Sequence, residues 1–189
     1  MIQKSEILQS FSHGCIVSKL WLCNELEKHA SIRSTIHIFG SWYGNMALMI
    51  YLRQKIAFDK IINYENRPIM LIESNHVLDA LNFEQKLDIM PVDCNTVTLP
   101  ANPTQLLINT STENMQNAGW FQNIPSGTLV ALQGRTSNFE PTEPNIIDFT
   151  SLSHFKTTFP LTTTLFEGET YFGYPDGRDY TRFMLIGYK

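Results

Sequence analysis

The segment Ile36–Asn45, which reads IHIFGSWYGN, constrains the fold more than any other part of this 189-residue chain. β-Branched and aromatic residues at Thr35–Phe39 predict a strand that ends at Gly40. Good helix formers follow at Met46–Leu52. Gly40 can adopt backbone conformations closed to other residues, and Gly44 lets the helix begin close to the strand or to a ligand. The segment therefore predicts a strand, a tight turn and a helix in direct succession.

The alternation of strand and helix continues along the chain. Further strands are expected at Asp59–Glu65, Leu87–Val92, Gln105–Asn109 and Thr128–Gln133, and helices at Ser18–Lys28, from Pro68 to about Leu81, at Asn117–Gln122 and at Ser151–Phe159. Two long C-terminal strands, Thr164–Phe172 and Asp179–Lys189, flank a Pro-Asp-Gly turn typical of a hairpin. We therefore expect an α/β fold, a doubly wound sheet of about seven strands. Most strands are expected to be parallel, with an antiparallel C-terminal hairpin and helices on both faces.

Composition favours one folded domain over residues 1–189. Hydrophobic residues make up 43% and charged residues 17%, which is typical of a chain with a packed core, and no repeat or linker divides it. The net charge of -4 disfavours stable binding to duplex nucleic acid, because such proteins usually carry a basic surplus. Apolar runs are shorter than the roughly 18 residues that span a bilayer, and Met1–Ser10 lacks an apolar signal core. We expect a cytoplasmic protein with no membrane segment.

Cysteine and histidine spacing argues against a metal site. Cys15, Cys23 and Cys94 form no CxxC pair, and the five histidines show no HxH or HxxxH spacing. Reduced thiols are the simplest interpretation of the cysteines. His37 lies inside a predicted strand, where a structural role is favoured over a catalytic one.

The glycine turn admits several interpretations. A phosphate-binding loop would need Gly-Lys-Ser/Thr at its end, and no lysine follows Gly44. A dinucleotide fingerprint would need a glycine at position 42, where Trp42 would obstruct a pyrophosphate. A plain strand, turn and helix with two convenient glycines stays open as an alternative.

Two acidic residues follow the next two strands. Glu65 ends the second predicted strand, where a carboxylate can accept hydrogen bonds from both hydroxyls of a ribose. Asp93 follows the third strand, where a carboxylate can accept a hydrogen bond from an adenine amino group. Glu73 is a weaker substitute for Glu65, because strand ends are uncertain by a few residues. Each acid alone could also be an ordinary surface turn residue. Together with the glycine turn, they would lie in a line along the ligand-binding edge of an open α/β sheet.

With these features the chain resembles the class I methyltransferases that depend on S-adenosylmethionine (SAM), which have a Rossmann-like fold. IHIFGSWYG stands where that family has its strand and glycine loop, and DYTRFMLIGYK stands where it has its closing antiparallel strand. The stretch INTSTENM, Ile108–Met115, also resembles a small phage and bacterial group of such enzymes. The resemblance implies that the N-terminal helical segment, residues 1–30, covers the cofactor. It also implies that SAM binds to Gly40, Ser41, Trp42, Gly44, Glu65, Asp93, Cys94 and Asn109.

The polar segment after the fourth predicted strand is the expected acceptor region. The resemblance implies that Asn109 and Glu113 act on the acceptor, with Glu113 as a general base. The prolines and the aromatic residue that amine methyltransferases often carry here are missing, which disfavours methylation of nucleic-acid bases. Trp42 and Tyr43 are candidates for a cation–π contact with the sulfonium, although Tyr43 is better explained as a core residue. The same polar segment could instead be a turn that caps the next helix.

The leading hypothesis from the sequence is a SAM-dependent methyltransferase acting on an unidentified acceptor, most simply a small molecule. The alternative is a SAM or nucleoside binder that acts as an accessory protein or sensor and transfers nothing. A dinucleotide-dependent oxidoreductase is a third hypothesis, against which Trp42 argues.

Overall fold

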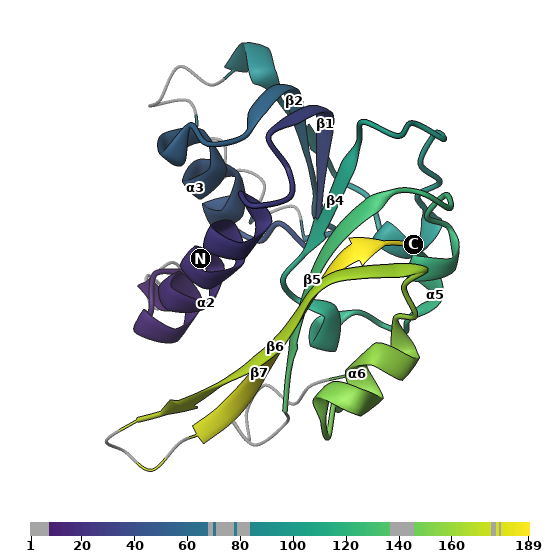
Figure 1. Cartoon of the computed structure of the whole chain (residues 1–189). Coiled ribbons are helices and arrows are strands. Elements are labelled where there is room, and N and C mark those ends of the chain that lie inside the picture. Colours follow the sequence, from purple (N-terminus) through teal and green to yellow (C-terminus); the bar gives the residue numbers. More distant parts are fainter. Residues whose placement is uncertain are drawn as a thin grey trace.

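The computed structural model describes residues 8–67, 70, 78, 84–136, 146–174, 177 and 179–189. Within these residues, seven strands form one continuous sheet (Figure 1). The strands are β1 (Ile32–Phe39), β2 (Ala57–Tyr64), β3 (Leu87–Met90), β4 (Leu106–Asn109), β5 (Leu129–Arg135), β6 (Thr163–Gly173) and β7 (Asp179–Tyr188).

The strand order is β3-β2-β1-β4-β5-β7-β6. The first five strands are parallel, whereas β7 runs antiparallel to both β5 and β6. The chain moves outward from β1 to β3 and then crosses back to β4 on the other side of β1. This reversal leaves a crevice beyond the carboxyl ends of β1 and β4, which is where ligands bind in sheets of this type. The predicted fold class is confirmed.

Helices cover both faces of the sheet (Figure 1). α2 (His13–Leu26) and α3 (Asn45–Arg53) pack on one face, against alternate strand residues such as Ile36, Ile38 and Ile108. α5 (Gly119–Gln122) and α6 (Leu152–Thr158) lie on the opposite face. There the core is mainly aromatic and contains Phe39, Trp120, Phe121, Phe149, Phe155, Phe159 and Phe183. The two faces thus have separate cores of different chemistry.

The N-terminal helix differs most from its predicted bounds. Ser18–Lys28 was expected from apolar spacing, but α2 begins five residues earlier, at His13, and ends at Leu26. Its buried positions include Gly14, Ser18 and Lys19 as well as apolar residues. Small and polar residues carry no hydrophobic periodicity, so the pattern did not reveal the first turns of the helix.

The remaining elements lie within a few residues of their predicted positions. β1 begins three residues earlier than expected, and β5 continues two residues further, to Arg135. The side-chain oxygen of Ser151 accepts a hydrogen bond from the His154 N–H, which confirms the expected cap of α6. The helix expected from Pro68 to about Leu81, Glu73 within it, and much of the hairpin turn lie outside the described residues. No helix in the described ranges has the length and apolar character needed to cross a membrane.

Candidate functional site

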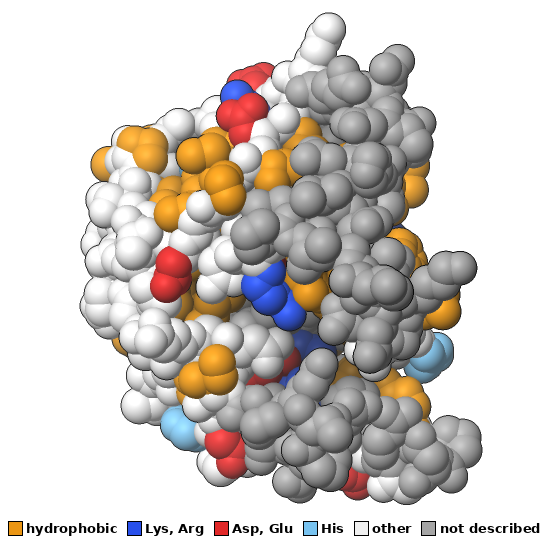
Figure 2. All heavy atoms as spheres, turned by 180° about the vertical axis from the view of Figure 1, so that it is seen from behind, with side chains coloured by type: hydrophobic (Ala, Val, Ile, Leu, Met, Phe, Trp, Pro, Cys, Tyr) orange, Lys and Arg blue, Asp and Glu red, His pale blue; other side chains and the backbone are white. Residues whose placement is uncertain are grey.

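A cavity of about 790 Å³ opens at the carboxyl edge of the sheet. Its lining comes from α2, from the segments that follow β1, β2, β3 and β4, from the end of β5 and from the β6–β7 hairpin. Figure 2 shows this side of the molecule hollowed, with acidic and basic side chains next to one another inside the hollow. The volume falls within the range of small-molecule sites, about 300–1,000 Å³. The cavity is therefore the candidate binding site.

The glycine turn after β1 forms part of the cavity wall. Gly40 and Gly44 have φ angles of 61° and 78°, in the left-handed region that glycine adopts without strain. Trp42 also lies in this region, with φ 52°, which is unfavourable for a bulky side chain. Position 42 thus has the backbone conformation of a glycine but carries a half-buried indole that lines the cavity. The tight turn therefore forms although position 42 is tryptophan and not the glycine of a dinucleotide fingerprint.

Glu65, directly after β2, connects this turn to the cavity. Its carboxylate is 5% exposed and accepts hydrogen bonds from the backbone N–H groups of Trp42 and Arg67, each at 3.0 Å. Each carboxylate oxygen can accept a second hydrogen bond. Glu65 therefore holds the turn in place and still has acceptor capacity on the side that faces the cavity.

Asp93 and Cys94 line the same cavity beyond β3. Asp93 lies three residues past the strand end and accepts hydrogen bonds from the backbone and side-chain nitrogens of Asn95, at 2.9 and 3.0 Å. Burial raises the pKa of the Cys94 thiol to about 12, although a backbone hydrogen bond from Gly40 acts in the opposite direction. Cys94 is thus a neutral, buried thiol. The turn, Glu65 and Asp93 converge on one cavity, as the spacing of the sequence predicted.

Three of the predicted site residues lie behind the wall instead of lining the cavity. Ser41 is buried, and its N–H donates to the carbonyl of Tyr64. Gly44 is the N-cap residue of α3. The fully buried Asn109 accepts a hydrogen bond from the Ser111 N–H at 2.9 Å, which stabilises the turn after β4. In this structure these residues shape the site, and Tyr43 is likewise buried.

A buried histidine–tyrosine pair lies below the glycine turn. His37 Nδ1 and Tyr64 Oη are 2.9 Å apart, and Tyr64 also lines the cavity. Burial lowers the pKa of His37 to about 4, against an opposing hydrogen bond with Gln105. Burial also raises the pKa of Tyr64 to about 12. Both groups are neutral near pH 7, which agrees with the structural role predicted for His37.

The opposite part of the cavity contains charged side chains, of which sequence analysis identified only Glu113. Glu113 Oε1 lies 3.2 Å from Arg135 Nε and 3.3 Å from Arg182 Nη1. Lys19 of α2 lines the same region. We call Lys19, Glu113, Arg135 and Arg182 the charged cluster. The available signal was a basic residue at the end of one apolar strand, TLVALQGR, and inside another, DYTRFMLIGY.

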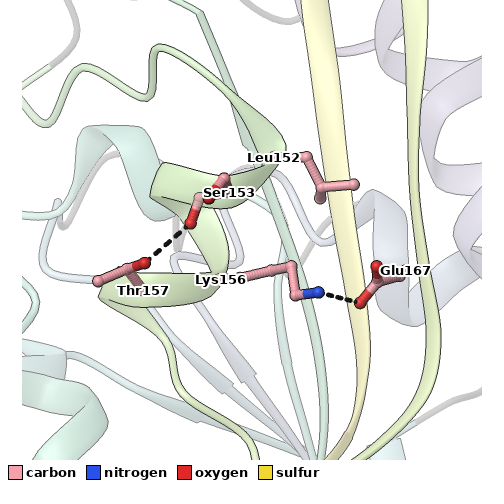
Figure 3. Close-up of a pocket in the computed structure, with 5 residues that line it drawn as sticks. All are labelled: Leu152, Ser153, Lys156, Thr157 and Glu167. Carbon is pink, nitrogen blue, oxygen red and sulfur yellow. Dashed lines mark hydrogen bonds and ion pairs between the residues drawn. The ribbon is translucent and has the colours of Figure 1, made fainter.

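A second hollow lies between α6 and β6, lined by Leu152, Ser153, Lys156, Thr157 and Glu167 (Figure 3). Its charged pair, Lys156 and Glu167, is partly exposed, with 2.6 Å between Nζ and Oε2. This hollow lies away from the carboxyl edge, and its charges already satisfy each other. Substitutions of Lys156 or Glu167 are therefore suitable controls for substitutions in the cavity.

Comparison with known proteins gives similarity in structure but not in sequence. No protein-family model matches the chain. No curated protein matches it in sequence. A SAM-dependent methyltransferase from Aquifex aeolicus aligns with a TM-score of 0.68 at 10% identity, over 98% of this chain and 99% of that one. The N-methyltransferase NodS from Bradyrhizobium japonicum WM9 aligns with a TM-score of 0.66 at 8% identity, over 91% and 95%.

Another similar structure is the [4+2]-cyclase SpnF, with a TM-score of 0.65 at 9% identity, over 89% of this chain and 81% of that one. These likenesses show that the chain has the Rossmann-like fold found in SAM-dependent methyltransferases. At such low identity they establish the fold alone, since one fold carries many functions. The phage and bacterial group suggested by Ile108–Met115 stays a prediction.

Proposed function

We propose that this chain binds SAM at the carboxyl edge of its sheet and transfers the methyl group to a small-molecule acceptor. The observation that supports this most directly is the position of Glu65. Its buried carboxylate follows β2, accepts the Trp42 N–H of the glycine turn and lines a cavity shared with Asp93. This arrangement suits a ribose whose two hydroxyls donate to one carboxylate.

The residues present fit a SAM molecule in one orientation. Glu65 would hold the ribose, Asp93 and the wall near Cys94 would contact the adenine, and the turn from Gly40 to Trp42 would face the methionine part. SAM supplies a methyl carbon already activated by its bond to a positively charged sulfur. The protein's contribution is then to position the acceptor and to exclude water.

Glu113 has a different role in this proposal from the general base expected at first. Its Oε1 atom accepts hydrogen bonds from two arginines, so this oxygen holds Arg135 and Arg182 in position. Asn109 likewise supports the turn at Ser111. We therefore infer that Asn109 and Glu113 are positioning residues, and that the acceptor's nucleophile is either already deprotonated or loses its proton to solvent.

The N-terminal segment is proposed to cover the bound cofactor. Gln9, Ser12, Cys15 and Lys19 line the cavity from the side opposite the strand ends. The Asn45 side chain donates to the Ser10 carbonyl at 2.7 Å, and the Gln133 side chain donates to the Ser18 carbonyl at 2.9 Å. The segment is thus tied to α3 at Ser10 and to β5 at Ser18. This supports treating the segment and the sheet as one unit; we propose that residues 1–189 are that functional unit and that it is located in the cytoplasm.

A binder that transfers nothing is the second candidate. The two ion pairs of Glu113 favour it, because two adjacent guanidinium groups stabilise the ionised carboxylate and so make it a weaker base.

Calorimetry with SAM and with its demethylated product, S-adenosylhomocysteine, tests the binding step. We expect 1:1 binding of both at micromolar to submicromolar concentration. Absence of binding at millimolar ligand would refute the proposal. Incubation of a cell extract with methyl-labelled SAM then separates the two candidates, because only the methyltransferase adds label to an acceptor.

A further inference from the structure

Three members of the charged cluster, Glu113, Arg135 and Arg182, have no role in the proposed SAM contacts, and the fourth, Lys19, belongs to the segment proposed to cover the cofactor. The four members come from α2, from η3 (Thr112–Asn114), from the end of β5 and from β7. Each member is at most 9% exposed. Three are cations and one is an anion, so positive charges outnumber negative charges within the cluster by two. Burying uncompensated charge is costly, and it persists mainly where a ligand supplies the opposite charge.

The two arginines lie directly opposite each other on neighbouring strands. Arg135 and Arg182 are partners in the antiparallel ladder of β5 and β7. Like charges in such a pair destabilise a sheet. Glu113 reduces the repulsion by accepting from both guanidinium groups through the same oxygen, Oε1. The cluster still contains one carboxylate for two arginines and a lysine.

Lys19 has the least compensation of the three cations. Its ammonium group forms no ion pair within the described part of the chain. Burial lowers the pKa of Lys19, and the nearby Arg182 acts in the same direction, whereas Cys15 and Glu113 raise it. A buried lysine at a helix position that could hold an apolar residue is hard to explain by stability alone. Lys19 lines the same cavity as the other three members of the cluster.

Aromatic rings hold the two guanidinium groups in place. The Tyr180 ring centroid lies 5.4 Å from the guanidinium carbon of Arg182 and 5.9 Å from that of Arg135. Tyr180 is in turn stacked on Phe172, with 5.0 Å between ring centroids. Gly14 lets α2 approach the β6–β7 hairpin closely, because a Cβ atom there would clash with the hydroxyl groups of Tyr174 and Tyr180. Rigid cations of this kind are preorganised for an anion.

We propose that the charged cluster binds a carboxylate or phosphate group of the methyl acceptor, so that the substrate is a small oxyanion-bearing molecule. This inference rests on the proposed function for the identity of the second ligand. The oxyanion contacts Lys19 and the arginine pair, and its negative charge offsets the excess positive charge of the cluster. The rest of the acceptor then extends across the cavity toward the glycine turn.

The test measures thermal stability of the full chain with simple oxyanions at constant ionic strength. Inorganic phosphate, acetate and benzoate, each at about 10 mM, are compared with chloride. We expect the best of the three to raise Tm by about 3 °C, because an anion that binds only the folded state stabilises it. A response to phosphate alone assigns a phosphate group, and a response to acetate or benzoate assigns a carboxylate. Equal Tm in all four salts overturns the inference.

The variant Lys19→Met separates a binding site from a general salt effect. Methionine has a similar length without charge, so we expect Lys19→Met to have a higher Tm than wild type in chloride. We also expect it to lose most of the response to oxyanions, to below about 1 °C. The control Lys156→Met removes an exposed lysine beside Glu167 and should keep the full response. An unchanged oxyanion response in Lys19→Met would overturn the assignment.

Arg135→Gln gives an independent measurement if Lys19→Met does not fold. This variant removes the repulsion across the two strands and should weaken oxyanion binding about tenfold or more; unchanged binding overturns the inference.

Titration with S-adenosylhomocysteine on the same samples distinguishes the two proposals. Cofactor binding without an oxyanion response refutes the acceptor site alone. An oxyanion response without cofactor binding refutes the methyltransferase and keeps the anion site.

Discussion

The two ends of the cavity are built in different ways. At the proposed cofactor end, the glycine turn, Glu65 and Asp93 follow three successive strands, and backbone N–H groups donate to both carboxylates. At the proposed acceptor end, the charged cluster comes from four elements spread from Lys19 to Arg182, and its cations outnumber its one carboxylate. The first end is built from local turns, whereas the second end depends on tertiary packing.

This difference implies that the two ends respond differently to substitution. Hydrogen bonds to backbone groups at the cofactor end keep the turn in shape, so changes there should affect binding more than folding. Buried charges at the acceptor end are packed where α2, β5 and β7 meet, so changes there should affect folding strongly.

Glu113→Gln should cause the largest loss of stability. It removes the only described carboxylate that faces Arg135 and Arg182, and breaking a buried ion pair on one side typically costs about 3–5 kcal/mol. Urea unfolding followed by fluorescence measures the loss. The control Glu167→Gln removes an exposed partner of Lys156 and should cost less than about 1 kcal/mol. Equal losses of unfolding free energy in the two variants would show that Glu113 stabilises the fold no more than an exposed carboxylate does.

Acidification should weaken folding through His37, below the cofactor end. The pKa of His37 is about 4 in the folded chain, against an ordinary value of 6.5. Between these values the unfolded chain binds a proton that the folded chain does not, so stability present above pH 6.5 is lost as pH falls toward 4. The loss is at most about 3 kcal/mol. Unfolding free energies of wild type and His37→Gln across this range provide the measurement, and parallel pH profiles would contradict the assignment.

Glu65→Ala should weaken binding of S-adenosylhomocysteine about 30-fold, or roughly 2 kcal/mol, because two hydrogen bonds to a charged group are lost. Isothermal titration calorimetry gives the dissociation constant directly. Asp88→Ala removes an exposed carboxylate of β3 that pairs with Lys60 and should leave this constant unchanged. If Glu65→Ala binds as tightly as wild type, Glu65 does not contact the cofactor.

Trp42→Gly and Trp42→Ala together test the backbone of the turn. Glycine tolerates the left-handed conformation of position 42, whereas alanine does not, so the glycine variant should be more stable by about 1 kcal/mol. Thermal unfolding of both variants gives the difference. An alanine variant as stable as the glycine variant would show that the turn is not left-handed in solution.

Much of the fold could be predicted from local pattern. The β-branched runs, the glycines and the Pro-Asp-Gly turn predicted seven strands whose ends agree with the structure to within three residues. The first turns of α2 could not be predicted, because Gly14, Ser18 and Lys19 look like solvent-exposed residues until the hairpin packs against them.

The cofactor end was determined by the sequence itself. Residues that directly follow parallel strands meet at one edge whatever the rest of the chain does, so a turn at Gly40 and acids at positions 65 and 93 had to converge. The acceptor end was decided only by the tertiary structure. Its charges are separated by up to 163 positions, from Lys19 to Arg182, and nothing local to any of them specifies the others. The pairing of β5 with β7 and the packing of α2 over both are what bring Lys19, Arg135 and Arg182 around one carboxylate.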